Sequence, residues 1–143
     1  MSKAIIISKN GGPEVLELKD INVGSPGPDE VKVENIAIGI NYIDTYHRSG
    51  LYPVKLPTGI GLEGAGKVVE IGSSVTEFNI GDNIAYAGMP MGAYTSEKII
   101  PTKIAVKIPT GISYKTAACL MTKGLTTNYL INKTYGLKAN ETI

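Results

Sequence analysis

The sequence predicts a mainly β protein with a helical C-terminal part, which places it in the α+β fold class. Up to about residue 112, short apolar or alternating runs are separated by glycine and proline, as is typical of a small barrel or sandwich. After Ser113 the apolar residues follow a helical spacing instead. We therefore expect one domain over residues 1–112 and a helical connector over residues 113–143.

The expected strands follow one another from the N-terminus. Residues 4–7 form a short apolar run, and the turn signal from Asn10 to Pro13 ends it. A second strand is expected to begin at Val15, and the apolar–polar alternation over residues 31–36 predicts a third, half-buried strand. Further short strands are expected at residues 68–71, 84–87, 93–100 and 104–108.

Two regions are expected to be helical. Residues 41–48 should form a short helix that Gly50 ends. Ser113 is a suitable N-cap for a second helical region. Gly124 either separates that region into two helices or bends a single one, and Gly136 occupies a position typical of a C-cap.

Composition excludes several classes of function. The chain has 14 Lys and Arg against 13 Asp and Glu, so no strong field directs it to nucleic acid or to an anionic membrane. The single cysteine, Cys119, cannot form a disulfide within the chain and fits a reducing compartment. No apolar run approaches the length of a membrane span or of a signal-peptide core. We therefore expect a cytoplasmic protein without nucleic-acid or membrane partners.

A glycine-spaced motif between Gly61 and Val75 points to a family. The sequence matches G-H-E, two residues, G, five residues, G, two residues, V at every fixed position except the histidine, which is Leu62. This pattern resembles the signature of the zinc alcohol dehydrogenases, but a leucine has no lone pair to offer zinc. The resemblance is therefore to the zinc-free branch of the medium-chain dehydrogenase/reductase superfamily, the NADPH-dependent quinone oxidoreductases.

The resemblance extends over the whole chain, through residues 12–16, 37–53, 92–94 and 123–126. It implies a GroES-like, partly open β-barrel, which is the catalytic domain of the superfamily. Members of the family are about twice as long and continue into a Rossmann domain, whose glycine-rich turn holds the cofactor pyrophosphate. The chain contains no such turn, so we expect the cofactor-holding half to be absent. Residues 141–143 resemble the start of its first strand.

The resemblance also implies site residues. Asn41 would lie beside the nicotinamide and the substrate, where its amide can both donate and accept hydrogen bonds; otherwise it ends a strand or caps the next helix. Tyr46 and Tyr52 would line the cleft and stack on a flat quinone, or they are merely half-buried tyrosines. Thr126 and Tyr129, one turn apart, would face the nicotinamide, or they serve only their own helix.

No metal site is expected. The resemblance places Asn41 and Leu62 where the zinc enzymes have ligands, and His47 and Cys119 cannot complete a tetrahedral site alone. Glu63 would stand behind the missing metal, where a carboxylate needs a cationic or hydrogen-bonding partner. Arg48 is a candidate for that partner.

The function that the resemblance implies is hydride transfer from NADPH to a quinone. Quinones are strong hydride acceptors, so positioning the two flat partners can replace a Lewis acid. Two alternatives remain open: a zinc-free reductase of enones or enoyl thioesters, and a non-enzymatic binding or oligomerising domain. Apolar faces around Leu125 and Leu130 are expected to be exposed, which favours a homodimer or looser self-association.

Overall fold

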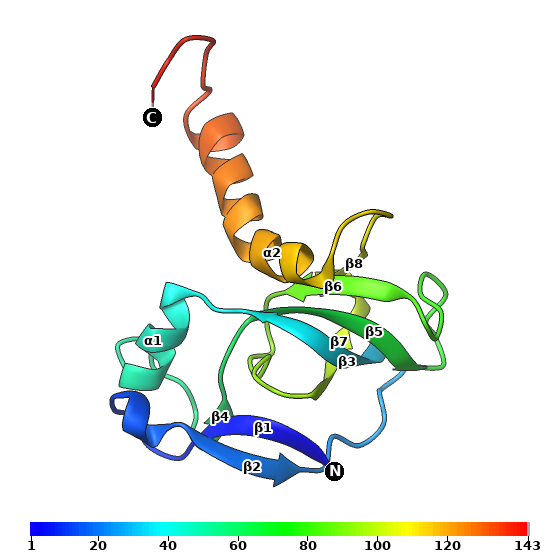
Figure 1. Ribbon diagram of the computed structural model, residues 1–143. Helices are drawn as coiled ribbons and strands as arrows, with labels where there is room; N and C mark the ends of the chain where they lie inside the picture. Colours follow the sequence, from blue (N-terminus) through cyan, green and yellow to red (C-terminus); the bar gives the residue numbers. More distant parts are fainter. Residues whose placement is uncertain (143) are drawn as a thin grey trace.

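The computed structural model describes residues 1–142 and confirms the mainly β class. Two antiparallel sheets form the body of the molecule (Figure 1). The smaller sheet has the order β2-β1-β4, with β1 at Ser2–Ile7, β2 at Glu17–Ile21 and β4 at Thr58–Gly59. The larger sheet has the order β7-β3-β5-β6-β8, with strands Glu97–Pro101, Glu30–Gly39, Glu63–Ile71, Asn83–Ala87 and Ala105–Lys107.

Main-chain hydrogen bonds connect the two sheets into a partly open barrel. The amide of Ile5 in β1 donates to the carbonyl of Tyr94 at 2.8 Å, and the amide of Ser96 donates to the carbonyl of Lys3 at 2.8 Å. The main core cluster lies among the strands of the larger sheet, where Val33, Val68 and Tyr86 have no accessible surface. Burial of these alternate positions explains the period-two pattern in the sequence.

The helices occupy different parts of the barrel. The short helix α1, Tyr42–Ser49, directly follows β3, and α2, Tyr114–Tyr129, starts on the larger sheet and extends away from it towards the C-terminus (Figure 1). Short 3₁₀ turns occur at Pro13–Val15 and Thr102–Ile104, and a π-helical turn at Leu130–Thr134 continues α2.

Small residues allow α2 to approach the sheet closely. Ala117 and Ala118 of α2 pack on Ala65 and Ala85 in a buried cluster. A Cβ atom at Gly39, the last residue of β3, would lie 2.3 Å from the carbonyl oxygen of Ala118. Only glycine therefore permits this contact between β3 and the first half of α2.

Several predicted boundaries were wrong. Val15 lies in the 3₁₀ turn, so the second strand begins at Glu17. Residues 93–96 contribute only an isolated bridge before β7. The strand predicted at residues 68–71 begins earlier, at Glu63, because its first half is glycine- and alanine-rich and carries little apolar signal. Strand β4, two residues long, was not predicted.

The helical predictions had a mixed outcome. The short helix and its cap at Gly50, which has a φ of 85°, are confirmed, as is the N-cap Ser113, whose hydroxyl accepts a hydrogen bond from the amide of Thr116. Gly124 does not interrupt α2, which is continuous from Tyr114 to Tyr129. The last helical residue is Thr134, and the C-cap is Tyr135 instead of the predicted Gly136.

No helix among residues 1–142 combines the length and the apolar character that crossing a membrane requires.

Candidate active site

The candidate site begins at Asn41, the N-cap of α1. Its backbone amide donates to Oδ2 of Asp44 at 2.9 Å, and the amide of Asp44 donates back to the carbonyl oxygen of Asn41 at 3.0 Å. These two bonds fix the start of α1 at the end of β3. The Asn41 side chain is 7% exposed, so the barrel holds it in place and its polar atoms need partners.

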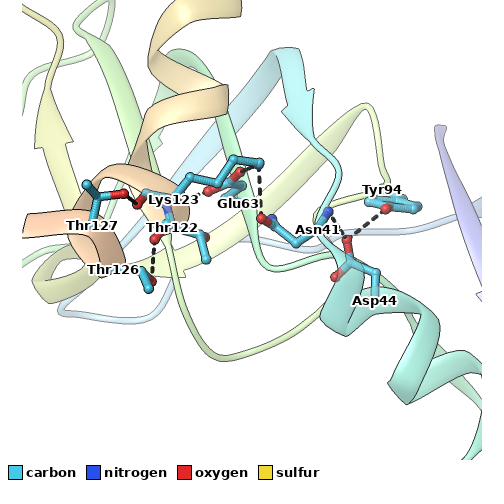
Figure 2. Close-up of polar contacts among 8 residues, drawn as sticks. All are labelled: Asn41, Asp44, Glu63, Tyr94, Thr122, Lys123, Thr126 and Thr127. Carbon is cyan, nitrogen blue, oxygen red and sulfur yellow. Dashed lines mark hydrogen bonds and ion pairs between the residues drawn. The ribbon is translucent and has the colours of Figure 1, made fainter. Parts of the chain in front are cut away.

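Glu63 lies beside Asn41 because β3 and β5 are neighbours. In the register of these strands Glu63 pairs with Gly39, two residues before Asn41. Its carboxylate has no accessible surface and accepts hydrogen bonds from Lys123 Nζ at 2.9 Å and from the backbone amide of Thr122 at 2.5 Å. The counter-charge of this buried carboxylate is therefore a lysine of α2 (Figure 2).

Lys123 connects the two buried side chains. Its Nζ donates to Glu63 and also to Oδ1 of Asn41 at 3.0 Å, while its side chain remains 51% exposed (Figure 2). The ammonium group thus lies at the boundary between the buried cluster and solvent. We call Asn41, Glu63 and Lys123 the polar triad.

Two opposing influences act on the acidity of Glu63. Burial by itself would raise the pKa of this carboxyl, but hydrogen bonds from Thr122 and Lys123 outweigh burial and lower the pKa below its usual value. Asn41 makes a smaller contribution in the same direction, although its amide nitrogen Nδ2 has no hydrogen-bond partner of normal geometry. Glu63 is therefore an ionised, structurally bound carboxylate rather than a general acid.

The partner predicted for Glu63 was wrong. Arg48 instead donates its Nε to the carbonyl oxygen of Gly11 at 3.2 Å, which joins α1 to the turn after β1. Sequence analysis included Lys123 in a family motif but assigned it no role. The sequence did show that Glu63, if buried, requires a cation. That requirement gives the charge of the partner but not its position in the chain.

A second hydrogen-bonded pair lies on the other side of Asn41. The hydroxyl of Tyr94 donates to Oδ2 of Asp44 at 2.8 Å, and Asp44 is 4% exposed. Burial, and then the Asp44 carboxylate, raise the pKa of Tyr94, so this phenol stays protonated. Asn41, Asp44 and Tyr94 line a cavity of about 220 Å³ with Arg48 and four other residues. Sequence analysis assigned no role to Tyr94 or Asp44.

The two predicted tyrosines lie together at the C-terminal end of α1. The ring centroids of Tyr46 and Tyr52 are 5.2 Å apart, and the amide of Tyr52 donates to the carbonyl oxygen of Tyr46 at 3.2 Å. Tyr42 packs edge-on against Tyr46 with centroids 5.4 Å apart. Tyr46 is half-buried and Tyr52 is 48% exposed, so both rings belong to one partly accessible aromatic cluster.

Thr126 and Tyr129 lie on α2 beyond Lys123. The hydroxyl of Thr126 donates to the carbonyl oxygen of Thr122 at 2.8 Å, a bond within its own helix, as the alternative to a cofactor role predicted (Figure 2). Thr126 is exposed, and Tyr129 is 61% exposed. The structure joins Asn41 directly to Lys123, with Thr126 one turn further along α2, and it shows no contact between Tyr129 and the polar triad.

The donor atoms near the site do not fit a metal ion. Within residues 1–142, no three His, Cys, Asp or Glu side chains gather where they could hold one. Leu62, at the histidine position of the motif, offers no lone pair, and the carboxylate of Glu63 is already bonded to the Lys123 ammonium.

Comparison with known proteins places these features in a family. The profile of the alcohol dehydrogenase GroES-like domain matches residues 27–110. A quinone oxidoreductase of Pseudomonas aeruginosa is 52% identical over 144 residues, and a 2-haloacrylate reductase of Burkholderia is 37% identical over 147 residues. These alignments cover 100% and 99% of this chain, and in each case 44% of the relative. The chain therefore spans less than half the length of these relatives.

A solved structure agrees with the sequence comparison. The crystal structure of Escherichia coli quinone oxidoreductase complexed with NADPH superposes with a TM-score of 0.95 at 46% identity. The superposition covers 97% of this chain and 43% of that protein.

Proposed function

The chain belongs to the alcohol dehydrogenase GroES-like domain family and within it to the quinone oxidoreductases, and from this we propose that it is the acceptor-side domain of an NADPH:quinone reductase. In this proposal residues 1–112 form the catalytic barrel, and residues 113–143 connect it to a dinucleotide-binding domain. That second domain completes the cleft, so we expect the 143 residues alone to have little or no activity.

The polar triad is the observation that carries the proposal. It places an asparagine amide and a lysine ammonium side by side at the junction of β3, β5, α1 and α2. These are donors suited to carbonyl oxygens, which both a quinone and a nicotinamide carboxamide possess. No general base and no metal is needed, because hydride transfer to a quinone depends mainly on the positions of the two partners.

Asn41 fits the cofactor that the family implies. The Nδ2 atom of Asn41 is buried without a hydrogen-bond partner of normal geometry, which leaves a donor for the carboxamide oxygen of a nicotinamide. When bound, the reduced nicotinamide would supply the hydride. Thr126 and Tyr129, exposed on α2, would then lie along the same side of the cofactor.

The tyrosine cluster is suited to a flat acceptor. Tyr46 and Tyr52 present aromatic surface, and the Tyr52 side chain is 48% exposed. In this proposal Tyr52 stacks on the quinone, and water or the Tyr46 hydroxyl supplies a proton to the product oxygen. Replacing Tyr46 by phenylalanine should lower turnover; unchanged turnover would exclude Tyr46 as the proton donor.

The decisive experiment joins this chain to the remaining part of the Pseudomonas aeruginosa relative, which we call the fusion protein. We expect NADPH-dependent reduction of a small quinone by the fusion protein, and weak or no NADPH binding by the 143 residues alone in a fluorescence titration. If the purified, folded fusion protein reduces no quinone, the proposed activity is refuted. The two alternatives would then be a reductase of enones or enoyl thioesters and a binding or oligomerising domain.

A second candidate follows from the similarity to the 2-haloacrylate reductase, whose name indicates reduction of an activated carbon–carbon double bond. The same two donors would bind the carbonyl of an enone or an enoyl thioester. Comparing a quinone, a 2-haloacrylate and an enoyl thioester as acceptors for the fusion protein distinguishes the two activities. We expect the quinone to have the highest kcat/KM.

We also propose that the domain self-associates through the outer face of α2. Leu125 is 59% and Leu130 is 49% exposed, as the sequence predicted, and Thr127, Leu130 and Ile131 line an apolar hollow with two further residues. Exposed apolar patches of this kind promote association. Light scattering of the 143 residues at high concentration should detect a dimer or larger species, and a clean monomer would contradict this.

A further inference from the structure

Lys123 is held more rigidly than an ordinary surface lysine. Its Nζ bonds to two side chains that are almost completely inaccessible, Glu63 at 0% and Asn41 at 7% exposure. By contrast, the ion pair between Lys3 and Asp20 joins side chains that are 62% and 52% exposed. The two buried anchors lie on different elements, so they determine the position of the ammonium group as well as its charge.

The ammonium group also retains capacity for a further hydrogen bond. A lysine has three N–H donors, and two of them are directed to Glu63 and Asn41 within residues 1–142. The side chain is 51% exposed, so the third donor can bond to a molecule that arrives from solvent. A positive charge fixed in advance beside a reacting carbonyl is the arrangement that stabilises a developing oxyanion.

We propose that Lys123 is a catalytic residue that donates a hydrogen bond to the acceptor oxygen as negative charge develops on it. This inference rests on the proposed hydride transfer. The C–H bond of the reduced cofactor breaks and its electron pair moves with the hydrogen to the quinone, which is reduced to a hydroquinone monoanion while the cofactor is oxidised. Lys123 stabilises the resulting anionic oxygen, and a proton from water or from the Tyr46 hydroxyl completes the hydroquinone. Lys123 keeps its own protons throughout.

The alternative is that Lys123 only neutralises Glu63, and a pair of substitutions separates the two roles. Lys123→Met in the fusion protein should reduce kcat by about 100-fold, the loss typical of removing one oxyanion donor. Because that variant leaves a buried charge unpaired and can fail to fold, the double variant Glu63→Gln with Lys123→Met removes both charges together. If Lys123 acts on the acceptor, the kcat of the folded double variant should be reduced by the same factor of about 100 as that of Lys123→Met. If Lys123 only neutralises Glu63, the double variant regains wild-type turnover, which would overturn the proposal.

A measurement without turnover tests the same contact. 4-Nitrophenol, whose ionised form absorbs visible light, is a probe for a site that favours an oxyanion. In the cofactor-free fusion protein, binding beside Lys123 should lower the pKa of the probe. In the double variant, the acid dissociation constant of the bound probe should be about tenfold or more below its value in the wild type. Lys3→Met, which removes a lysine charge at an exposed pair, is the matched control and should change neither reading.

The outcomes for the two proposals are distinguishable. A folded wild-type fusion protein that reduces no quinone contradicts the proposed function. An active wild type whose double variant is equally active, or whose bound nitrophenol has the same pKa with and without Lys123, contradicts the role of Lys123 alone.

Discussion

Replacing Lys123 by methionine should weaken the pH dependence of the stability that Glu63 contributes. In the wild type, burial favours a raised pKa for Glu63, but the hydrogen bonds from Thr122 and Lys123 prevail and lower it. A carboxyl whose pKa is lowered by folding stabilises the protein above its unfolded pKa. That stability is lost as the pH falls through the folded pKa.

The substitution removes one of the hydrogen bonds that oppose the effect of burial on the pKa of Glu63. Glu63, with no accessible surface, keeps the hydrogen bond from the Thr122 amide but loses its counter-charge. Its folded pKa should then lie closer to the unfolded value, so Glu63 contributes less stability above the unfolded pKa and less is lost as the pH falls. At neutral pH we expect the variant to lose about 3 kcal/mol, the low end for breaking a buried pair, because the lysine is half exposed and water can replace it.

Urea unfolding across the acidic to neutral range measures this effect. The control is Lys3→Met, which breaks an exposed pair and should cost at most about 1 kcal/mol with little change in pH dependence. The double variant with Glu63→Gln should recover much of the loss, because no buried charge remains. The reasoning is refuted if Lys123→Met is no less stable than Lys3→Met, or if its stability increases with pH as steeply as that of the wild type.

Three further perturbations test the fold around the site. Burial lowers the pKa of Lys98 to about 8. The unfolded chain therefore binds this proton more tightly than the folded one, so the free energy of unfolding should rise as the pH increases above about 8. Lys98→Met should remove that rise in urea titrations. Gly39→Ala, whose Cβ would lie 2.3 Å from a carbonyl oxygen of α2, should lower the free energy of unfolding by about 3 kcal/mol or more, as measured by thermal unfolding. Gly124→Ala, with no neighbouring atom nearer than 3.9 Å, should instead raise it by about 0.5–1 kcal/mol. Ser113→Ala removes the acceptor for the Thr116 amide and should cost about 1 kcal/mol, with a helical circular-dichroism signal that is lost earlier on heating.

Local chemistry explains which parts of the fold were predictable from sequence. The half-buried strand around Val31 and Val33, the short helix ended by Gly50 and the cap at Ser113 each follow from spacing or from a single backbone preference. Strand β5 was predicted too short because Gly64, Ala65 and Gly66 carry little apolar signal, and only pairing with β3 and β6 makes them a strand. Gly124 was predicted to disturb α2, yet the cost of one glycine is small compared with that of breaking a helix.

The candidate site also has features that one segment of sequence predicts and features that depend on contacts between distant segments. The glycine-spaced motif identified the family, and the replacement of its histidine by Leu62 removed a metal ligand, because both depend on residue type and spacing within one segment. The partner of Glu63 could not be obtained in this way. Arg48 and Lys123 both carry the required charge, and Lys123 is 60 positions away in the chain. The choice between them depends on how α2 crosses β3 and β5, and that crossing is set by close packing of Ala118 over Gly39, a contact between distant segments that forms only when the chain folds.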